Sequence, residues 1–139
     1  MRLVLCHGTF DWLHWGHVAM FKEARELGDR LVVSMTADAY LNKGLGRPIF
    51  NQAVRADFIK ELRCVDEVYI CPEKSGLTAI RYWKPDFYVK GGDYLTGDKH
   101  GALNMERVEV EKHGGELVIL DRLPHYSSSD IIRRLRETL

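Results

Sequence analysis

The chain has 139 residues, of which 45% are hydrophobic and 29% charged, and its twenty basic residues balance its twenty acidic ones. This length suits one domain, and the balanced charge gives no field that would draw the chain to nucleic acid or a membrane surface. The cysteines at 6, 64 and 71 form no CxxC pair, so we expect neither a disulfide framework nor a structural zinc site. With no signal pattern and no apolar run near the roughly 20 residues that span a bilayer, we expect a cytoplasmic protein.

Short apolar runs alternate with amphipathic ones along the chain. Residues 2–6 predict a strand in which Cys6 is a buried small side chain. Residues 17–28 carry apolar side chains at helical spacing and end on Gly28, where a C-cap is expected. Asn51 is the expected N-cap of a helix over 51–63. The other predicted elements are strands at 30–36, 66–71, 86–90 and 116–120 and helices near 75–83, 103–113 and 128–138.

Continuously apolar strands separated by helices indicate a parallel sheet covered on both faces. Five such strands and five helices fit a single domain over 1–139 of the doubly wound α/β class. Ligands of these sheets bind beyond the carboxyl ends of the strands. The residues that follow each strand are therefore the candidates for a binding site.

The first strand leads into HGTFDWLHWGH, residues 7–17. Gly8 and Thr9 let backbone N–H groups approach an anion closely. His14 and His17 are three residues apart at the start of a helix, so both imidazoles can share one face beside its positive end and donate to phosphate. A satisfied core histidine is the alternative for either ring, and a metal site would need further ligands, of which only Asp11 is near in sequence. We therefore expect no metal at these histidines.

Three later segments also follow strands and suit phosphate or nucleoside. NKGLGRP (42–48) offers Lys43 and Arg47 to an anion, or is a solvated connection. KGGDY (90–94) sets an acceptor beside an aromatic ring, as a ribose or base needs, or is a plain glycine turn. YSSSD (126–130) has more hydroxyls than one N-cap requires. No P-loop and no GxGxxG following a strand is present, which disfavours ATPases and dinucleotide enzymes.

Two of these motifs resemble those of one superfamily. GTFDWLHWGH is similar to the GxFDxxHxGH motif of cytidylyltransferase-like nucleotidyltransferases, and YSSSDII to their C-terminal ISTT motif. Segments 28–48, 84–94 and 113–120 resemble the adenylyltransferase domain of ADP-heptose synthase, which serves lipopolysaccharide or surface-glycan pathways. LHWGH and ELRCVDEV resemble glycerol-3-phosphate cytidylyltransferase instead. The first match is longer, and we favour it. A Rossmann-like fold is implied by either.

The resemblance implies a role for each matching position. His14 and His17 would stabilise the pentavalent transition state, and Lys43 would bridge the substrate phosphate and the nucleotide. Arg55 and Arg63 match arginines on the substrate side. The positions expected to bind the nucleotide are Gly8, Thr9, Phe10, Asp11, Gly16, Lys90, Gly92, Asp93, Tyr94, Arg122, Ser127, Ser128 and Ser129. The chain departs from the family pattern where serines replace frequent threonines, and where His125 and Tyr126 replace a frequent Gly-Ile.

The implied reaction transfers a nucleoside monophosphate from ATP, or less favourably CTP, to a sugar 1-phosphate, with D-glycero-D-manno-heptose 1-phosphate as the expected acceptor. Mg²⁺ would be bound through the nucleotide phosphates, and the chain would form a homodimer without nucleic-acid or membrane partners. The alternatives are a cytidylyltransferase acting on a polyol phosphate, glycerol 3-phosphate, and a regulatory module that binds nucleotide without catalysis. Class I aminoacyl-tRNA synthetases share the HxGH motif, but this sequence lacks their length and lysine-rich second motif.

Overall fold

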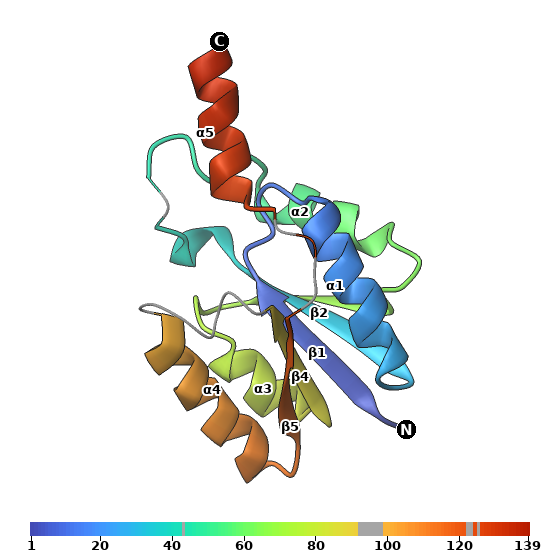
Figure 1. Cartoon of the computed structure of the whole chain (residues 1–139). Coiled ribbons are helices and arrows are strands. Elements are labelled where there is room, and N and C mark those ends of the chain that lie inside the picture. Colours follow the sequence, from blue (N-terminus) through green and yellow to red (C-terminus); the bar gives the residue numbers. More distant parts are fainter. Residues whose placement is uncertain (43, 92–98, 122–123, 125) are drawn as a thin grey trace.

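A sheet of five parallel strands runs through the centre of the molecule (Figure 1). The computed structural model describes the whole chain except residues 43, 92–98, 122, 123 and 125. The strand order across the sheet is β3-β2-β1-β4-β5, so the chain begins in the middle and winds outwards twice. The strands are β1 (Leu3–Gly8), β2 (Arg30–Thr36), β3 (Glu67–Cys71), β4 (Phe87–Gly91) and β5 (Glu116–Leu120). The predicted α/β fold is confirmed.

Helices cover both faces of this sheet, and one more extends beyond its carboxyl edge. The helices are α1 (Trp15–Glu26), α2 (Gln52–Lys60), α3 (Leu77–Trp83), α4 (Lys99–Lys112) and α5 (Ser128–Thr138), with a short 3₁₀ turn at Asp38–Tyr40. Figure 1 shows α1 and α2 on one side, α3 and α4 on the other, and α5 projecting away from the sheet. None of the helices in the described ranges is long and apolar enough to cross a membrane.

Two apolar clusters, one on each face, account for the continuously apolar strands. Val4 and Cys6 of β1 pack with Phe21 of α1, whereas Leu5 between them packs with Ile80 of α3. Because side chains alternate across a strand, a sheet covered on both sides needs apolar residues at every position. Cys6 is fully buried as predicted, and burial raises the pKa of its thiol to about 12.

Several predicted boundaries are confirmed, and one cap is wrong. Strands 30–36 and 116–120 and the helix at 128–138 have the predicted limits, and Asn51 caps α2 by accepting a hydrogen bond from the Val54 N–H at 3.0 Å. The first helix ends at Glu26 with Leu27 as its C-cap. Gly28 lies one residue further, where a Cβ would come within 2.8 Å of the Arg2 carbonyl oxygen. The glycine is required by this close approach rather than by a left-handed cap.

Candidate active site

The two histidines form the start of α1. His14 is the N-cap, and its Nδ1 accepts a hydrogen bond from the Gly16 N–H at 3.1 Å. A second hydrogen bond runs in the opposite direction: the His14 N–H donates to His17 Nδ1 at 3.2 Å. The two rings stack with centroids 3.7 Å apart and planes 20° from parallel. Two imidazoles thus fill the reciprocal places that a serine and a glutamate occupy in an ordinary capping box.

This capping arrangement fixes the tautomer of both rings. A neutral imidazole whose Nδ1 accepts a hydrogen bond carries its proton on Nε2. Burial lowers the pKa of His14, which favours its neutral form. Both Nε2–H groups are therefore donors directed away from the backbone at the positive end of α1. Gly16 lies so close to the His14 ring that a Cβ would meet Cε1 at 2.9 Å, which explains why the motif has glycine between its histidines.

Phe10 supports the histidines from the core. Its side chain is 6% exposed, and its ring meets the His17 ring edge-on with centroids 5.1 Å apart. The same ring contacts Phe21 at 5.1 Å on the inner side. The Phe10 side chain therefore supports the His17 ring, and the predicted nucleotide contact of Phe10 stays a prediction.

Asp11 is also directed into the protein. Its side chain is fully buried, and Oδ2 accepts from the Ile49 N–H at 2.7 Å and from Arg47 Nε at 3.2 Å. Oδ1 accepts from the Phe50 N–H at 3.1 Å. Both oxygens are thus engaged by the protein, and the nucleotide contact of Asp11 stays a prediction. Asp11 anchors the end of the glycine-rich loop that carries Lys43, a residue outside the described part of the chain.

Arg47 is the residue that the sequence alone misassigns most clearly. Its side chain is 7% exposed, and its guanidinium bonds both the carboxylate and the carbonyl oxygen of Asp11. The prediction that Arg47 reaches towards an incoming anion is therefore wrong. A buried aspartate next to a phenylalanine needs a charged partner, and this requirement was the available signal for the pair.

Arg55 is buried rather than exposed to a substrate. Its Nη1 donates to the carbonyl oxygens of Thr9 and Thr36, each at 2.9 Å, and its Nε donates to that of Phe50 at 3.0 Å. Nη2 donates to Asp38 Oδ1 at 2.6 Å. The residue is 1% exposed. These protein acceptors engage all three guanidinium nitrogens, and the substrate contact of Arg55 stays a prediction. Arg55 ties the carboxyl ends of β1 and β2 to the loop before α2.

Arg63 lies at the opposite edge of the sheet. It is exposed in the connection between the end of α2 at Lys60 and the start of β3 at Glu67. The residues that precede a parallel strand lie at the amino edge, whereas the histidines lie at the carboxyl edge. The structure does not bring Arg63 together with the histidines, and its substrate contact stays a prediction.

Lys90 is the last residue but one of β4, the strand next to β1, and it is 3% exposed. Its ammonium donates to the His7 carbonyl oxygen at 2.8 Å and lies 5.3 Å from the centre of the Tyr88 ring. This contact joins the two central strands where the site begins. The residues expected to act with Lys90 on the base and ribose, and the expected phosphate ligand Arg122, lie outside the described residues; they are Gly92, Asp93, Tyr94 and Arg122.

His7 is a structural residue. The Ser34 hydroxyl donates to Nδ1 at 2.8 Å, and Nε2 donates to the Lys74 carbonyl oxygen at 2.9 Å. Burial, with a further contribution from the Lys90 charge, lowers the pKa of His7 to about 3. The ring is therefore neutral in the folded chain over most of the accessible pH range.

This neutral ring predicts an acid-sensitive contribution to stability. The unfolded chain binds a proton at His7 below pH about 6.5, whereas the folded chain binds it only below about 3. The contribution of His7 is fully present above pH 6.5 and declines by about 1.4 kcal/mol per pH unit as the pH falls between these values. Urea unfolding from pH 7.5 to 4 should show this slope in the wild type and a shallower one in His7→Gln. Parallel curves would contradict the prediction.

The serine run lies at the start of α5, and its members have different roles. Ser127 is the N-cap, and its Oγ accepts from the Asp130 N–H at 3.3 Å. The Ser128 hydroxyl donates to the carbonyl oxygen of Trp12 at 2.5 Å. Ser129 is exposed in the first turn. The ordinary N-cap alternative thus describes Ser127, whereas Ser128 links α5 to the histidine motif.

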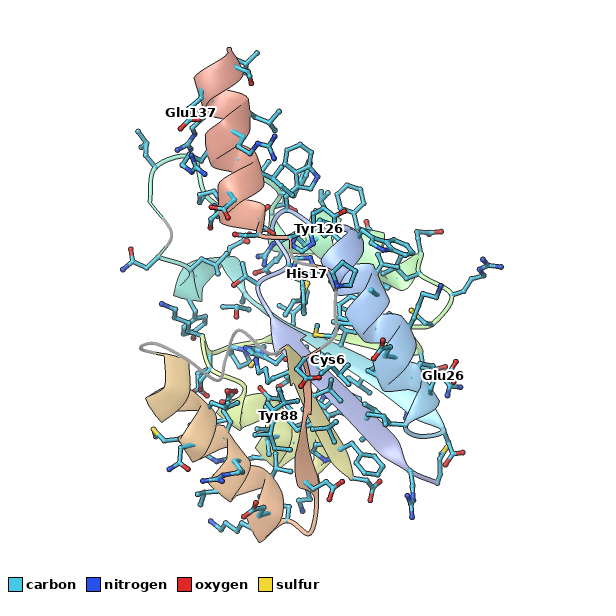
Figure 2. The ribbon with its side chains drawn as sticks, viewed as in Figure 1. Cys6, His17, Glu26, Tyr88, Tyr126 and Glu137 are labelled. Carbon is cyan, nitrogen blue, oxygen red and sulfur yellow. The ribbon has the colours of Figure 1, made fainter. Side chains whose placement is uncertain are left out.

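The two motifs predicted to share a site are brought together. Figure 2 places His17 at the start of α1 and Tyr126 just before α5 at the same end of the molecule. The Tyr126 ring lies 6.0 Å from the His14 ring, and the Pro124 carbonyl oxygen is 3.3 Å from the position of a Cβ on Gly16. Neither contact was predicted. Tyr126 was noted in the sequence only as a departure from the family pattern.

The starts of α1 and α5 together present hydrogen-bond donors that can bind an anion. Two Nε2–H groups lie at the N-terminus of α1, and the N-terminus of α5 follows a segment in contact with them. Helix N-termini favour phosphate groups. Within the described ranges, no group of three or more histidine, cysteine, aspartate or glutamate side chains is placed to hold a metal ion.

Known proteins resemble the chain along nearly its whole length. The sequence model of a family described as cytidylyltransferase-like matches residues 5–134. Bifunctional protein HldE of Azorhizobium caulinodans is 36% identical over 138 residues, which are 98% of this chain and 28% of that protein. HldE of Geotalea uraniireducens is 38% identical over 137 residues, 97% of this chain and 27% of that protein. The chain thus spans little more than a quarter of the length of these relatives.

Solved structures agree with the sequence relatives. The lipopolysaccharide core biosynthesis protein of Thermoplasma volcanium superposes with a TM-score of 0.69 at 30% identity, covering 91% of this chain and 99% of that one. Pantothenate synthetase of Thermus thermophilus superposes with a TM-score of 0.64 at 15% identity, covering 99% and 64%, and shows a shared fold alone. The family match over most of the sequence and the histidine pair at the carboxyl edge lead to one conclusion: the chain belongs to the cytidylyltransferase-like family.

Proposed function

We propose that the chain transfers a nucleoside monophosphate from a nucleoside triphosphate, ATP before CTP, to a sugar 1-phosphate, with D-glycero-D-manno-heptose 1-phosphate as the preferred acceptor. An oxygen of the acceptor phosphate attacks the α-phosphorus. The bond from that phosphorus to the oxygen bridging the β-phosphate breaks, and pyrophosphate leaves. Support comes from the family membership, from the similarity to HldE proteins and from the resemblance of residues 84–94 to an adenylyltransferase domain.

The observation that carries this proposal is the pair of Nε2–H donors held by the cap of α1. In-line displacement at phosphorus places extra negative charge on oxygens around the α-phosphorus, and fixed donors stabilise that charge. The acceptor needs no general base, because the second pKa of a phosphate monoester is about 6 and its oxygens are already ionised. Lys43 is the proposed further cation.

Mg²⁺ would enter with the triphosphate. It binds oxygen ligands and commonly keeps several of them from water and nucleotide phosphates. Asp11, the carboxylate of the HxGH motif region, has both oxygens engaged by the protein. The described residues therefore fit a magnesium ion held by the nucleotide rather than by a protein cage. The proposal also includes a homodimer in the cytoplasm, where the triphosphate donor is available.

A matrix of ATP, CTP, GTP and UTP against heptose 1-phosphate, glycerol 3-phosphate and related acceptors tests the proposal by pyrophosphate release. We expect the fastest release with ATP and heptose 1-phosphate. LHWGH and ELRCVDEV favour glycerol-3-phosphate cytidylyltransferase as the second candidate, and activity confined to CTP and glycerol 3-phosphate would establish it. Nucleotide binding without pyrophosphate release from any pair would instead identify a regulatory module.

A further inference from the structure

Five rings form a continuous row from the molecular surface to the core. Their order is Tyr126, His14, His17, Phe10 and Phe21, and successive centroids are separated by 6.0, 3.7, 5.1 and 5.1 Å. Tyr126 is 56% exposed, whereas Phe21 is completely buried. In this row of described rings, the two histidines therefore lie between the buried Phe10 ring and the exposed Tyr126 ring.

The inner and outer histidines are not held equally. The His17 ring is contacted edge-on by the Phe10 ring and is stacked on the His14 ring. In the described part of the chain, the His14 imidazole accepts one hydrogen bond, from the Gly16 N–H to Nδ1, and stacks on the His17 ring. One hydrogen bond leaves an imidazole free to tilt about that bond. The ring of Tyr126, inclined at 45° to His14 with its centroid 6.0 Å away, is a further contact of this imidazole.

Tyr126 is itself held on both sides along the chain. Two residues before it, the Pro124 carbonyl oxygen lies against Gly16. Two residues after it, the Ser128 hydroxyl donates to the Trp12 carbonyl oxygen at 2.5 Å. Gly16 and Trp12 both belong to the histidine motif, so Pro124 and Ser128 both lie against that motif. A ring so placed is built into the arrangement rather than left at a loose surface position.

We propose that Tyr126 is a positioning residue, whose ring covers the outer face of His14 and holds its Nε2–H in the direction of the reacting phosphate. The inference rests on the proposed function for its catalytic consequence. The family pattern has isoleucine at the matching position, which offers no flat face to an imidazole. The hydroxyl of Tyr126 has no part in the proposal, so a phenylalanine ring should serve equally well.

The same ring affects the protonation of His14. Burial lowers the pKa of His14, and removal of the covering ring would hydrate the imidazole and raise that pKa towards its ordinary value. In the described part of the chain, His14 contacts the titratable side chains of His17 from α1 and of Tyr126. Because burial is the cause of the lowered pKa, hydration of the ring is the main effect expected of the substitution.

Three variants test the proposal: Tyr126→Phe, Tyr126→Ala and Tyr126→Ile. In the pyrophosphate assay we expect the alanine and isoleucine variants to lose kcat on the order of tenfold, with KM for the nucleotide changed less, because a displaced donor weakens the transition state. Their acid limb of kcat should move to higher pH. Tyr126→Phe should restore both properties. Loss in Tyr126→Phe equal to that in Tyr126→Ala, or an effect on KM alone, would overturn the proposal.

A second measurement keeps this inference separate from the proposed function. The Cε1–H resonance of His14, assigned by its absence in His14→Gln, can be titrated by NMR without any substrate. Tyr126→Ala should raise the pKa of His14, and Tyr126→Phe should leave it unchanged. If the wild type releases no pyrophosphate but the titration behaves in this way, the proposed function fails and the ring contact stands. Unchanged titration in Tyr126→Ala would overturn the contact itself.

Discussion

Replacement of His17 by alanine is expected to lower kcat by about 100- to 1,000-fold, the usual effect of removing one donor to a developing oxyanion. The reason is geometric, because the His17 Nε2–H is directed by two contacts that do not depend on substrate: its Nδ1 bond to the His14 N–H and its packing on Phe10. Steady-state pyrophosphate release measures the loss. Turnover close to the wild-type value in His17→Ala would show that the histidines do not act on phosphate.

His17→Gln is the matched control for this substitution. Alanine removes the acceptor of the His14 N–H, which should cost roughly 0.5–2 kcal/mol of unfolding free energy, as other capping losses do. Glutamine is a normal capping-box residue at this helix position and can accept the same N–H. We therefore expect His17→Gln to unfold in urea like the wild type while kcat stays low. If His17→Gln regains the stability of the wild type but not its activity, the catalytic role of His17 is distinct from its role in capping α1.

Replacement of Asp11 by alanine is expected to lower the unfolding free energy by about 3–5 kcal/mol, the range for breaking one side of a buried ion pair. The loss is large because Arg47 stays 7% exposed without its partner, and the N–H groups of Ile49 and Phe50 lose their acceptor. Urea denaturation followed by circular dichroism measures it. Activity should fall as well, since the loop carrying Lys43 is no longer anchored.

A double-mutant cycle shows whether the pair is the cause. Arg47→Met removes the buried charge from the other side, and the double variant should be less destabilised than the sum of the two single variants. Arg133 and Glu137 form a control pair at 3.1 Å that is about 60% exposed at both ends. Arg133→Ala should cost less than about 1 kcal/mol. Additive effects of Asp11→Ala and Arg47→Met would contradict the proposed anchoring.

The sheet and the histidine pair could be predicted because both depend on short-range patterns. A parallel sheet covered on both faces favours strands with few polar residues, and strand 30–36 has apolar side chains at 31, 32, 33 and 35. The three-residue spacing of His14 and His17 is enough to stack them on one helix turn. The approach of the serine segment to this turn follows from the rule that strand ends meet at one edge.

The arginines could not be placed in the same way. The interior location of Arg55 depends on the carbonyl oxygens of Thr9 and Thr36, which belong to two separate strand ends and converge only in the folded chain. Arg63 is different, because a residue that precedes a parallel strand must lie at the amino edge. That conclusion was available from chain order, but the motif resemblance suggested a substrate contact. Lys43 and Asp93, with their neighbours outside the described residues, stay predictions.

The capping role of the two histidines has a consequence for how such a chain could change in evolution. A relative that lost catalysis would still need acceptors for the first N–H groups of α1, now supplied by His14 and His17. Serine or threonine at the first position and glutamate or glutamine at the second would preserve the helix and remove the phosphate donors. Genomes can therefore be searched for cytidylyltransferase-like chains with this substitution pattern. Such chains would be relatives that retain the fold but no longer catalyse the reaction.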